Sequence, residues 1–240
     1  MKTEIIDYFK EIKFDEASHS YTVKGKNLKP VSYVLKDFQE PFDEQKMAFL
    51  VAKKKGISVK EVLDDWNKKR DDSCTLGTKA HLFAENYVKT REGKPSNGYE
   101  KAMQTYLDKI PHYVVPLCTE LQMYSEKWGI AGTADLMFYD TKKDNIILRD
   151  YKTNLDLFKN YKGKRLLTPF DDLEDNPFNK YQLQLSLYQI LFEQTGFKID
   201  NRALIWVKPD GTYELYQTND YRDRLIEHLN KNYLLWEIQV

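Results

Sequence analysis

The chain has 240 residues, enough for one large domain with a sizeable core. Its composition, 41% hydrophobic and 31% charged, excludes a disordered protein, and no apolar run reaches the length of about 18 residues that a membrane-spanning helix needs. The 37 basic and 37 acidic residues give a formal net charge of zero, so any binding to nucleic acid must come from local clusters of positive charge.

The cysteines and the N-terminus favour an intracellular protein. Cys74 and Cys118 are too few for a disulfide framework or a four-thiolate iron–sulfur cluster. The first residues have neither the apolar core of a secretory signal nor the Arg-rich, acid-poor character of a transit peptide. We therefore expect a cytoplasmic protein that does not bind membranes.

The N-terminal part predicts short strands followed by helices. Residues 12–35 read as strands and turns, with hairpin-turn chemistry at Lys24-Gly25-Lys26-Asn27. Apolar residues at three-and-four spacing predict helix over 43–70, and Gly56 predicts a break that gives two helices. A third helix is expected from about Thr78 to Arg91, and a fourth from about Gly98 to Ile110.

The second half alternates in a strand pattern before it returns to helix. Residues 113–153 predict a meander of three strands, and residues 154–178 read as a long loop. A helix from about Lys180 to Thr195, a hairpin of 199–207 with 212–217, and a helix from about Tyr221 to Trp236 complete the order. This order predicts an α/β fold, with a central mixed β-sheet flanked by helices.

A hairpin of two strands brings two aspartates together. Asp150 and Lys152 end an apolar strand and share one face of it, because side chains alternate along a strand. If Tyr139 pairs with Ile146, Asp135 faces Asp150, with Cβ atoms about 4.5–5.5 Å apart. Two carboxylates this close repel each other, so a cation such as Mg²⁺ is expected between them.

Glu120 on the preceding strand is a third candidate acid. A two-residue turn at Lys127-Trp128 puts it opposite Asp135, and one at Trp128-Gly129 makes it a diagonal neighbour on the same face. A three-residue loop would turn it away unless a bulge corrects the register.

Two helical motifs point to the same region. Gly77-Thr-Lys-Ala-His81 reads as the start of a helix capped near Thr75 or Gly77, with His81 one turn in, where the helix dipole favours anions such as phosphate. Gln184 and Tyr188 lie four apart, on one face of a later helix. Ordinary interpretations stay open for each motif: salt-bridged strand ends, a packing histidine and a polar helix face.

Taken in order, the motifs resemble the RecB-like branch of the PD-(D/E)XK nuclease superfamily. The set consists of Gly77-x-x-x-His81, Glu120, Gly132-x-x-Asp135, Asp150-x-Lys152 and Gln184-x-x-x-Tyr188. Residues 167–175 and 179–188 look like the phage and viral exonucleases of this branch, which also includes the mitochondrial genome maintenance exonuclease. The resemblance implies a single nuclease domain over residues 1–240. It would have a restriction-endonuclease-like core (76–240) and an N-terminal strand and helical extension (1–75).

The resemblance also implies roles for the motif residues. Asp135 and Asp150 would bind the catalytic Mg²⁺, for which Mn²⁺ substitutes, with the backbone carbonyl of Tyr151 as a further ligand. His81 and Glu120 would complete one or two metal sites. Lys152 would polarise the attacking water or the scissile phosphate. Gln184 and Tyr188 would orient Lys152 or contact DNA. The cluster-binding relatives carry four cysteines, so this chain is expected to have no iron–sulfur cluster.

A local basic surface is needed for a neutral chain to hold DNA. The first choice is the group that closely follows Lys152, which consists of Lys159, Lys162, Lys164 and Arg165. Phe158 and Tyr161 lie among these cations and could stack on the bases of a single strand. The basic runs at 53–55 and 68–70 fit a solvated face equally well.

These patterns favour a Mg²⁺-dependent DNA exonuclease that acts on free ends, with single-stranded DNA in the site. Such an enzyme would serve DNA repair or recombination, or would be encoded by a phage and act in the host cytoplasm. The alternatives are a structure-specific endonuclease, a non-catalytic DNA-binding recombination partner of the same fold, and a structural protein with chance motifs. The motifs favour neither polarity of digestion, neither one metal ion nor two, and neither a monomer nor an oligomer.

Overall fold

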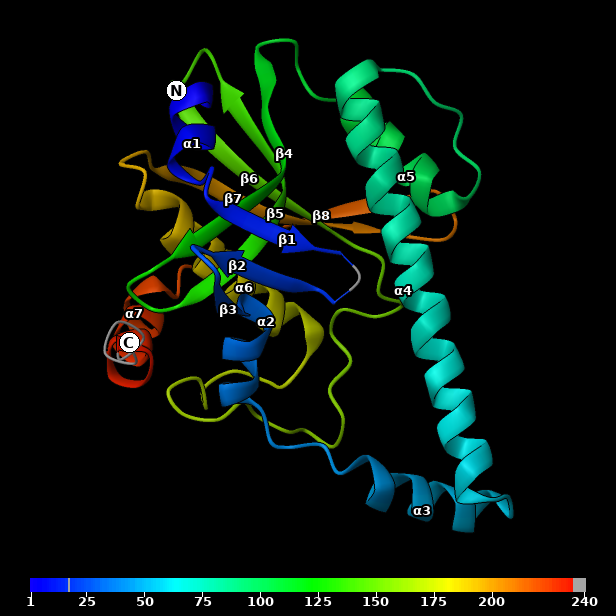
Figure 1. Ribbon diagram of the computed structural model, residues 1–240. Helices are drawn as coiled ribbons and strands as arrows, with labels where there is room; N and C mark the ends of the chain where they lie inside the picture. The colour runs from blue at the N-terminus through cyan, green and yellow to red at the C-terminus, as the bar shows by residue number, and fades with distance from the viewer. Residues whose placement is uncertain (17, 235–240) are drawn as a thin grey trace.

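A computed structural model describes residues 1–16 and 18–234 and has a mixed, open sheet at its centre (Figure 1). The strand order is β1-β2-β3-β5-β6-β7-β8, and β4 pairs with β5. The predicted α/β class with a central mixed sheet is therefore confirmed. Among the described residues, no helix is both long and apolar enough to cross a membrane.

The N-terminal elements form a small hairpin layer at one end of the sheet. Their bounds are α1 Lys2–Tyr8, β1 Ile12–Asp15, β2 Ser20–Val23, β3 Lys26–Pro30, α2 Val31–Val34 and the 3-10 helix η1 Leu35–Phe38. The predicted hairpin turn is confirmed, since Val23 pairs with Lys26 and Gly25 takes a φ of 78°. Such a positive φ costs glycine little and other residues more.

Two helices form an arm that extends away from the sheet in Figure 1: α3 Glu44–Lys55 and α4 Val59–Thr90. The predicted break is confirmed, because Gly56 ends α3 in a left-handed conformation with a φ of 68°. The predicted start of a new helix near Thr75 or Gly77 is wrong. Helix α4 starts at a capping box of Ser58 and Glu61 and continues through Gly77, which a long helix tolerates at about 1 kcal/mol relative to Ala.

The remaining elements follow the predicted order. They are α5 Gly98–Asp108, β4 Val114–Ser125, β5 Ile130–Asp140, β6 Asn145–Lys152, α6 Pro177–Glu193, β7 Ile199–Val207, β8 Tyr213–Gln217 and α7 Arg222–Asn232. The predicted long loop precedes α6. The predicted end of the last helix at Trp236 lies outside the described residues.

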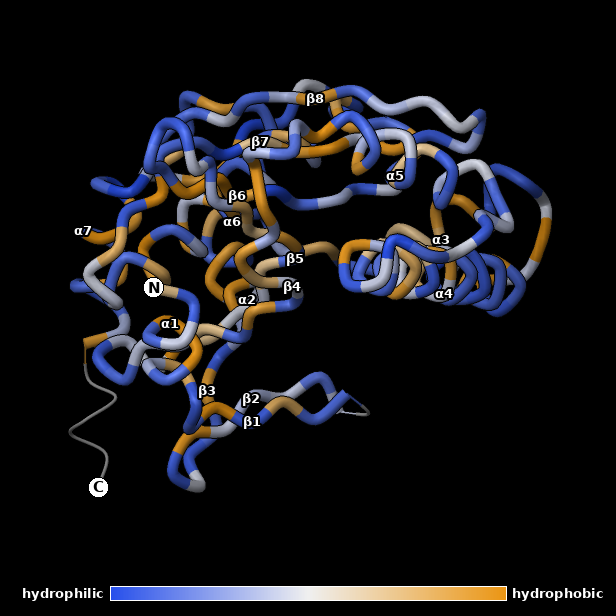
Figure 2. The backbone as a smooth tube through the Cα atoms, turned by 90° about the horizontal axis from the view of Figure 1, so that it is seen from above, coloured by the Kyte–Doolittle hydropathy of each residue, from blue (hydrophilic) through white to orange (hydrophobic). Residues whose placement is uncertain are grey.

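Alternate side chains of the central strands enter two separate cores. Met137 and Leu148 pack in the core that includes α6 and α7, whereas Leu136 and Phe138 pack in the core of α4 and α5. Seen from above in Figure 2, α4 is viewed nearly end-on at one side, with α1 and α7 at the other. Because neighbouring residues of β5 face opposite helices, side chains near its middle reach helices from both layers.

Strand β5 pairs with one strand along one edge and with two different strands along the other edge, and these two strands diverge to form a fork in the sheet. One edge pairs with β4 from Ile130 to Asp140. The other edge pairs in parallel with β3 at residues 130–131 and antiparallel with β6 at residues 136–140. Residues 132–135 lie between these two partners, so the segment that ends in Asp135 faces the fork.

Gly98 lies where the start of α5 meets the turn between β7 and β8. A Cβ atom added there would lie 1.8 Å from the carbonyl oxygen of Pro209, a backbone atom that cannot rotate away. We expect Gly98→Ala to lower the free energy of unfolding in urea by about 1–3 kcal/mol, the usual cost of overpacking. A matched control is Gly77→Ala in α4, whose Cβ would meet nothing closer than 3.7 Å. It should leave stability unchanged or raise it by up to about 1 kcal/mol. Equal effects of the two variants would contradict this packing.

Candidate metal centre

The hairpin of β5 and β6 has the predicted register. Tyr139 pairs with Ile146 and Met137 with Leu148, and the ladder continues to Leu136 with Arg149. The next step of this register brings Asp135 to Asp150. The side chain of Asp135 then accepts a hydrogen bond of 2.8 Å from the backbone N–H of Tyr151, which fixes its carboxylate across the end of β6.

Strand β4 brings Glu120 level with Asp135. Ser125 pairs with Ile130, and the backbone N–H of Gly129 donates a hydrogen bond of 3.3 Å to the carbonyl of Glu126. Lys127-Trp128 is therefore the two-residue turn, the first of the predicted geometries. Thr119 and Leu121 pair on either side of Glu120, which itself takes a φ of 48°. A left-handed glutamate costs of order 1–3 kcal/mol and is most often retained at functional sites.

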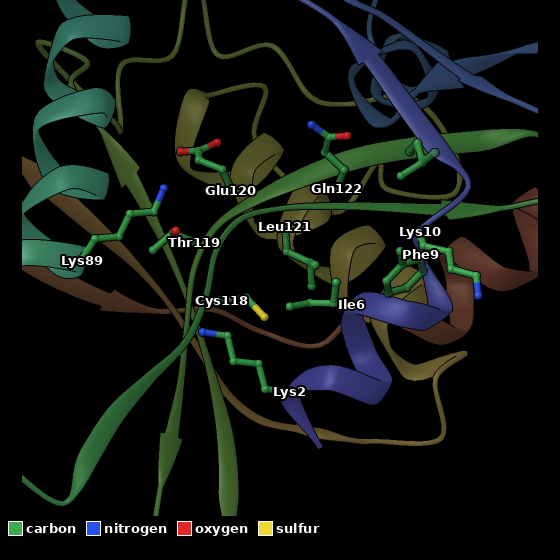
Figure 3. A pocket seen from close by; sticks show the side chains of 11 residues that line it. Lys2, Ile6, Phe9, Lys10, Lys89, Cys118, Thr119, Glu120, Leu121 and Gln122 are labelled. Atoms are coloured by element: carbon green, nitrogen blue, oxygen red, sulfur yellow. The ribbon is translucent and has the colours of Figure 1, made fainter.

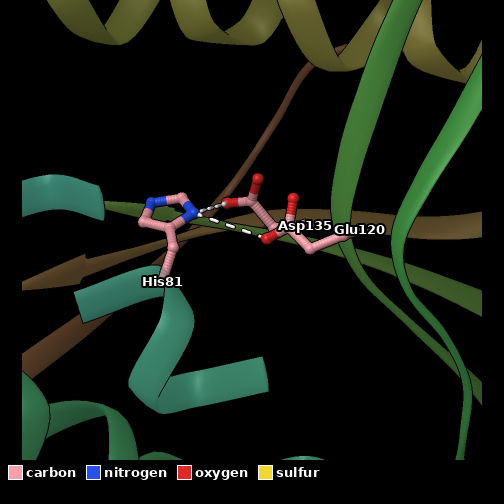
Figure 4. Close-up of side chains that lie close together, drawn as sticks. All are labelled: His81, Glu120 and Asp135. Carbon is pink, nitrogen blue, oxygen red and sulfur yellow. Dashed lines mark ion pairs between the residues drawn. The ribbon is translucent and has the colours of Figure 1, made fainter. Parts of the chain in front are cut away.

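His81 of α4 completes a group of three side chains (Figure 4). Its Nδ1 lies 3.5 Å from Oδ2 of Asp135 and 3.8 Å from Oε1 of Glu120. One ligand atom from each of the three lies within 4.8 Å of the others, close enough for one metal ion to bind all three. The expected place of His81 in a first helical turn is wrong. It lies far along α4, so the anion-binding role of a helix N-terminus does not apply to it.

The charges of this group compensate one another. Burial alone would lower the pKa of His81, but the carboxylate of Asp135 and then that of Glu120 outweigh it and raise the pKa to about 9. Burial raises the pKa of Asp135, and the charge of His81 opposes this. His81 therefore carries a proton at neutral pH in the metal-free protein and serves as counter-charge to two acids. A divalent cation would take over this charge and needs the neutral imidazole as ligand.

Asp150 and Lys152 form a buried ion pair beside this group. Asp150 is 1% exposed, and its burial, followed by the charge of Asp135, raises its pKa to about 6. Lys152 lies with its Nζ 4.5 Å from the ring centre of Tyr181, and the nearby aspartates raise its pKa despite burial. Asp150 thus faces the ammonium, and its expected role as a metal ligand stays a prediction, as does that of the Tyr151 carbonyl.

The predicted pair on α6 adjoins the same site. Nε2 of Gln184 donates a hydrogen bond of 3.0 Å to the hydroxyl of Tyr188. Burial, followed by the nearby charges of Asp150 and Asp135, raises the pKa of Tyr188 well above its ordinary value, so this hydroxyl keeps its proton. The buried Oε1 of Gln184 has no hydrogen-bond partner among the described residues and can accept one.

Gly132 makes room for Tyr188. A Cβ atom at this position would lie 2.6 Å from Cε1 of Tyr188 and 3.1 Å from Cγ2 of Val31. The Gly132-x-x-Asp135 spacing therefore has a steric reason: the strand that carries the acid must let the tyrosine ring of α6 approach its backbone.

The predicted DNA-binding cations lie in the loop before α6, and all four are exposed. Lys164 forms an ion pair with Glu40, and Nη1 of Arg165 donates a hydrogen bond of 2.7 Å to the carbonyl of Asp172. Lys162 lies over the ring of Tyr161, which is 56% exposed. The loop therefore presents cations and an aromatic ring, and three of these cations, Lys162, Lys164 and Arg165, also contact other groups of the protein.

A second basic surface lies on the other side of Glu120, in a cavity of about 360 Å³ between α1 and β4 (Figure 3). Three lysines line it, Lys2 and Lys10 from the N-terminal segment and Lys89 from α4. Lys89 is paired with Glu85, whereas no ion pair joins Lys2 or Lys10 to a described carboxylate. Sequence reasoning missed this surface, because the lysines are far apart along the chain and form no basic run.

Comparisons with known proteins do not assign the chain to a family. No model of a known protein family matches it, and no curated protein matches it. Seventeen chains of solved structures match. One is the crystal structure of SSO0001, which is 16% identical, with an alignment that covers 99% of this chain and 84% of that chain at a TM-score of 0.42. This likeness is too distant to assign a function.

Proposed function

We propose that the protein is a metal-dependent deoxyribonuclease of the RecB-like PD-(D/E)XK kind, which hydrolyses phosphodiester bonds from free DNA ends with a single strand in its site. One observation carries the proposal: His81, Glu120 and Asp135 converge from α4, β4 and β5, with the Asp150–Lys152 pair beside them. This group brings acids that can hold a cation next to an ammonium, and both positive charges could stabilise the negative charge that develops when a phosphate ester is hydrolysed.

The donor set fits a hard divalent cation. Two carboxylates and an imidazole suit Mg²⁺ or Mn²⁺, whereas the two cysteines, of which Cys74 is exposed and Cys118 buried, offer no thiolate cluster to a softer metal. When bound, such an ion would shield the phosphate charge, lower the pKa of water and stabilise the leaving oxygen. The left-handed Glu120 and the bond from Tyr151 to Asp135 hold two of the donors in place.

Lys152 acts as a fixed positive charge. In the metal-free protein the charges of Asp150 and Asp135 raise its pKa despite burial, so it carries its proton at neutral pH. Its ammonium can stabilise negative charge on the phosphate, and Asp150 and the ring of Tyr181 hold it in position. Gln184 and Tyr188 add a donor and an acceptor on the α6 side of the site.

Two basic surfaces connected to the site support a path for one strand. The cavity with Lys2 and Lys10 shares Glu120 with the metal group, and the loop with Lys159 and Lys162 directly follows Lys152 in the chain. Phosphate contacts by such lysines would release counterions and make binding depend on salt.

The experiment that tests this function compares end-labelled linear DNA with closed circular DNA, in Mg²⁺ and in EDTA. We expect loss of label from linear DNA only with Mg²⁺, and none from the closed circle. Asp64→Asn on the exposed side of α4 is the control, and should digest as the unaltered protein does. Equal cutting of circles would instead indicate an endonuclease, and no digestion of any DNA under Mg²⁺ or Mn²⁺ would refute the proposal.

The lysines of the α1 cavity should matter for DNA binding and not for the metal. We expect Lys2→Ala/Lys10→Ala to weaken binding of single-stranded DNA, measured with Ca²⁺ in place of Mg²⁺. The slope of log affinity against log salt should become shallower by about 0.7 for each phosphate that no longer meets a lysine. Lys13→Ala/Lys36→Ala, which removes two exposed lysines outside the cavity, is the control. An unchanged slope in the first variant would show that no strand lies there.

A further inference from the structure

Arg149 is a buried cation without an acid. It lies on the face of β6 opposite to Asp150, is 8% exposed, and forms no ion pair with a described carboxylate. Its Nε donates a hydrogen bond of 3.2 Å to the hydroxyl of Tyr106, and its Nη1 one of 2.9 Å to the carbonyl of Leu148. Buried charges are costly and almost always have a counter-charge.

A second buried arginine shows the usual arrangement. Arg202 is 7% exposed, and its Nη2 lies 3.6 Å from Oδ1 of Asp220. Thus Arg202 has an acidic partner, whereas Arg149 has none among the described residues.

A cavity of about 250 Å³ adjoins Arg149. Its wall contains a second cation, Lys109, and the rings of Tyr106, Phe138 and Tyr213, and no Asp or Glu lines it among the described residues. Nη2 of Arg149 donates to no described residue, so this end of the guanidinium is available to a ligand. The space therefore combines uncompensated positive charge with aromatic walls.

We propose that this cavity binds a small organic anion, a phosphate or carboxylate joined to a planar ring. A guanidinium matches the two oxygens of such a group in a forked geometry, and Lys109 adds a second charge at the exposed rim. Tyrosine and phenylalanine rings favour a flat apolar body. The cavity is smaller than the roughly 300–1,000 Å³ of pockets for drug-sized ligands, so the ligand is a small one.

Nucleotides and aromatic acids share this chemistry, and calorimetric titration can separate them. The probes are phenyl phosphate, benzoate and a nucleoside 5′-monophosphate, with phenol and inorganic phosphate as partial ligands. We expect phenyl phosphate or benzoate to bind at least about tenfold more tightly than phenol and than inorganic phosphate. If the nucleoside monophosphate binds most tightly of the probes, the cavity is a nucleotide site. If benzoate binds most tightly, it is a site for aromatic acids.

Variants connect the binding to the cavity. We expect Arg149→Met to lose at least about tenfold in affinity and Lys109→Ala to lose a few-fold. Lys101→Ala removes an exposed lysine of α5, the helix that Lys109 directly follows, and should lose nothing. If Arg149→Met does not fold, Lys109→Ala still tests the cavity, because Lys109 is exposed and its replacement leaves the core unchanged. The proposal is overturned if no probe binds at millimolar concentration, or if both cavity variants bind like the unaltered protein. Because these experiments measure binding, their outcome for the anion site does not depend on nuclease activity.

Discussion

Replacement of Asp135 with asparagine should reduce Mg²⁺-dependent hydrolysis of linear DNA by roughly a thousandfold or more. Asp135 is the acid that contacts His81 at 3.5 Å and is fixed by the Tyr151 N–H. A bound metal contributes several kcal/mol of transition-state stabilisation, and each 1.36 kcal/mol is a factor of ten in rate. Loss of one of three donors from so small a group should remove most of that contribution.

Two further measurements separate this effect from misfolding. The amide keeps an oxygen that can accept the Tyr151 bond, so circular dichroism and the thermal midpoint of Asp135→Asn should stay close to those of the unaltered protein. Titration with Mn²⁺ should show binding that is weakened at least tenfold, where each tenfold is about 1.4 kcal/mol. A folded variant that digests DNA at the normal rate would exclude Asp135 from the site.

Replacement of Lys152 with methionine should have the largest combined effect on stability and activity. It leaves the carboxylate of Asp150, which is 1% exposed, without its ammonium. An unpaired buried charge costs about 3–5 kcal/mol, and the variant also lacks the fixed cation near the phosphate. Measured by urea unfolding without metal, the decrease in stability should be smaller at pH 5 than at pH 8. Asp150, whose pKa is already raised to about 6, can bind a proton at the lower pH and becomes neutral.

A double variant distinguishes the two roles of this pair. Asp150→Asn/Lys152→Met removes both charges, so we expect it to recover most of the stability that Lys152→Met lacks and none of the nuclease activity. If the double variant is no more stable than Lys152→Met, the Asp150–Lys152 pair is not the cause of the instability. If Lys152→Met digests DNA at the normal rate, Lys152 has no role in hydrolysis.

The hairpin that carries the aspartates could be predicted because its evidence is local. The two-residue period of the strands and a short turn between Asp140 and Asn145 fix the pairing, and the structure has the predicted partners. The pairing of Glu120 with Asp135 follows in the same way from a turn at Lys127-Trp128, which is one of the turn geometries that the sequence left open and the one that the structure has.

Features that depend on distant residues could not be predicted. The sequence around Gly77 has the composition of a helix start, but the capping box at Ser58 already begins α4, and the helix continues through it. The lysines that line the α1 cavity come together only when the N-terminal helix packs beside β4. The isolation of Arg149 from any described acid is likewise a property of packing, since Asp150 is its neighbour in sequence and lies on the opposite face of the strand.

The most direct test of the metal centre is a crystal soaked in Mn²⁺ and measured by anomalous diffraction. We predict a peak between the side chains of His81, Glu120 and Asp135, which a matching crystal of Asp135→Asn should lack or show much weakened. Absence of a peak at these side chains in the unaltered protein, under conditions in which it digests DNA, would contradict a metal centre at this place.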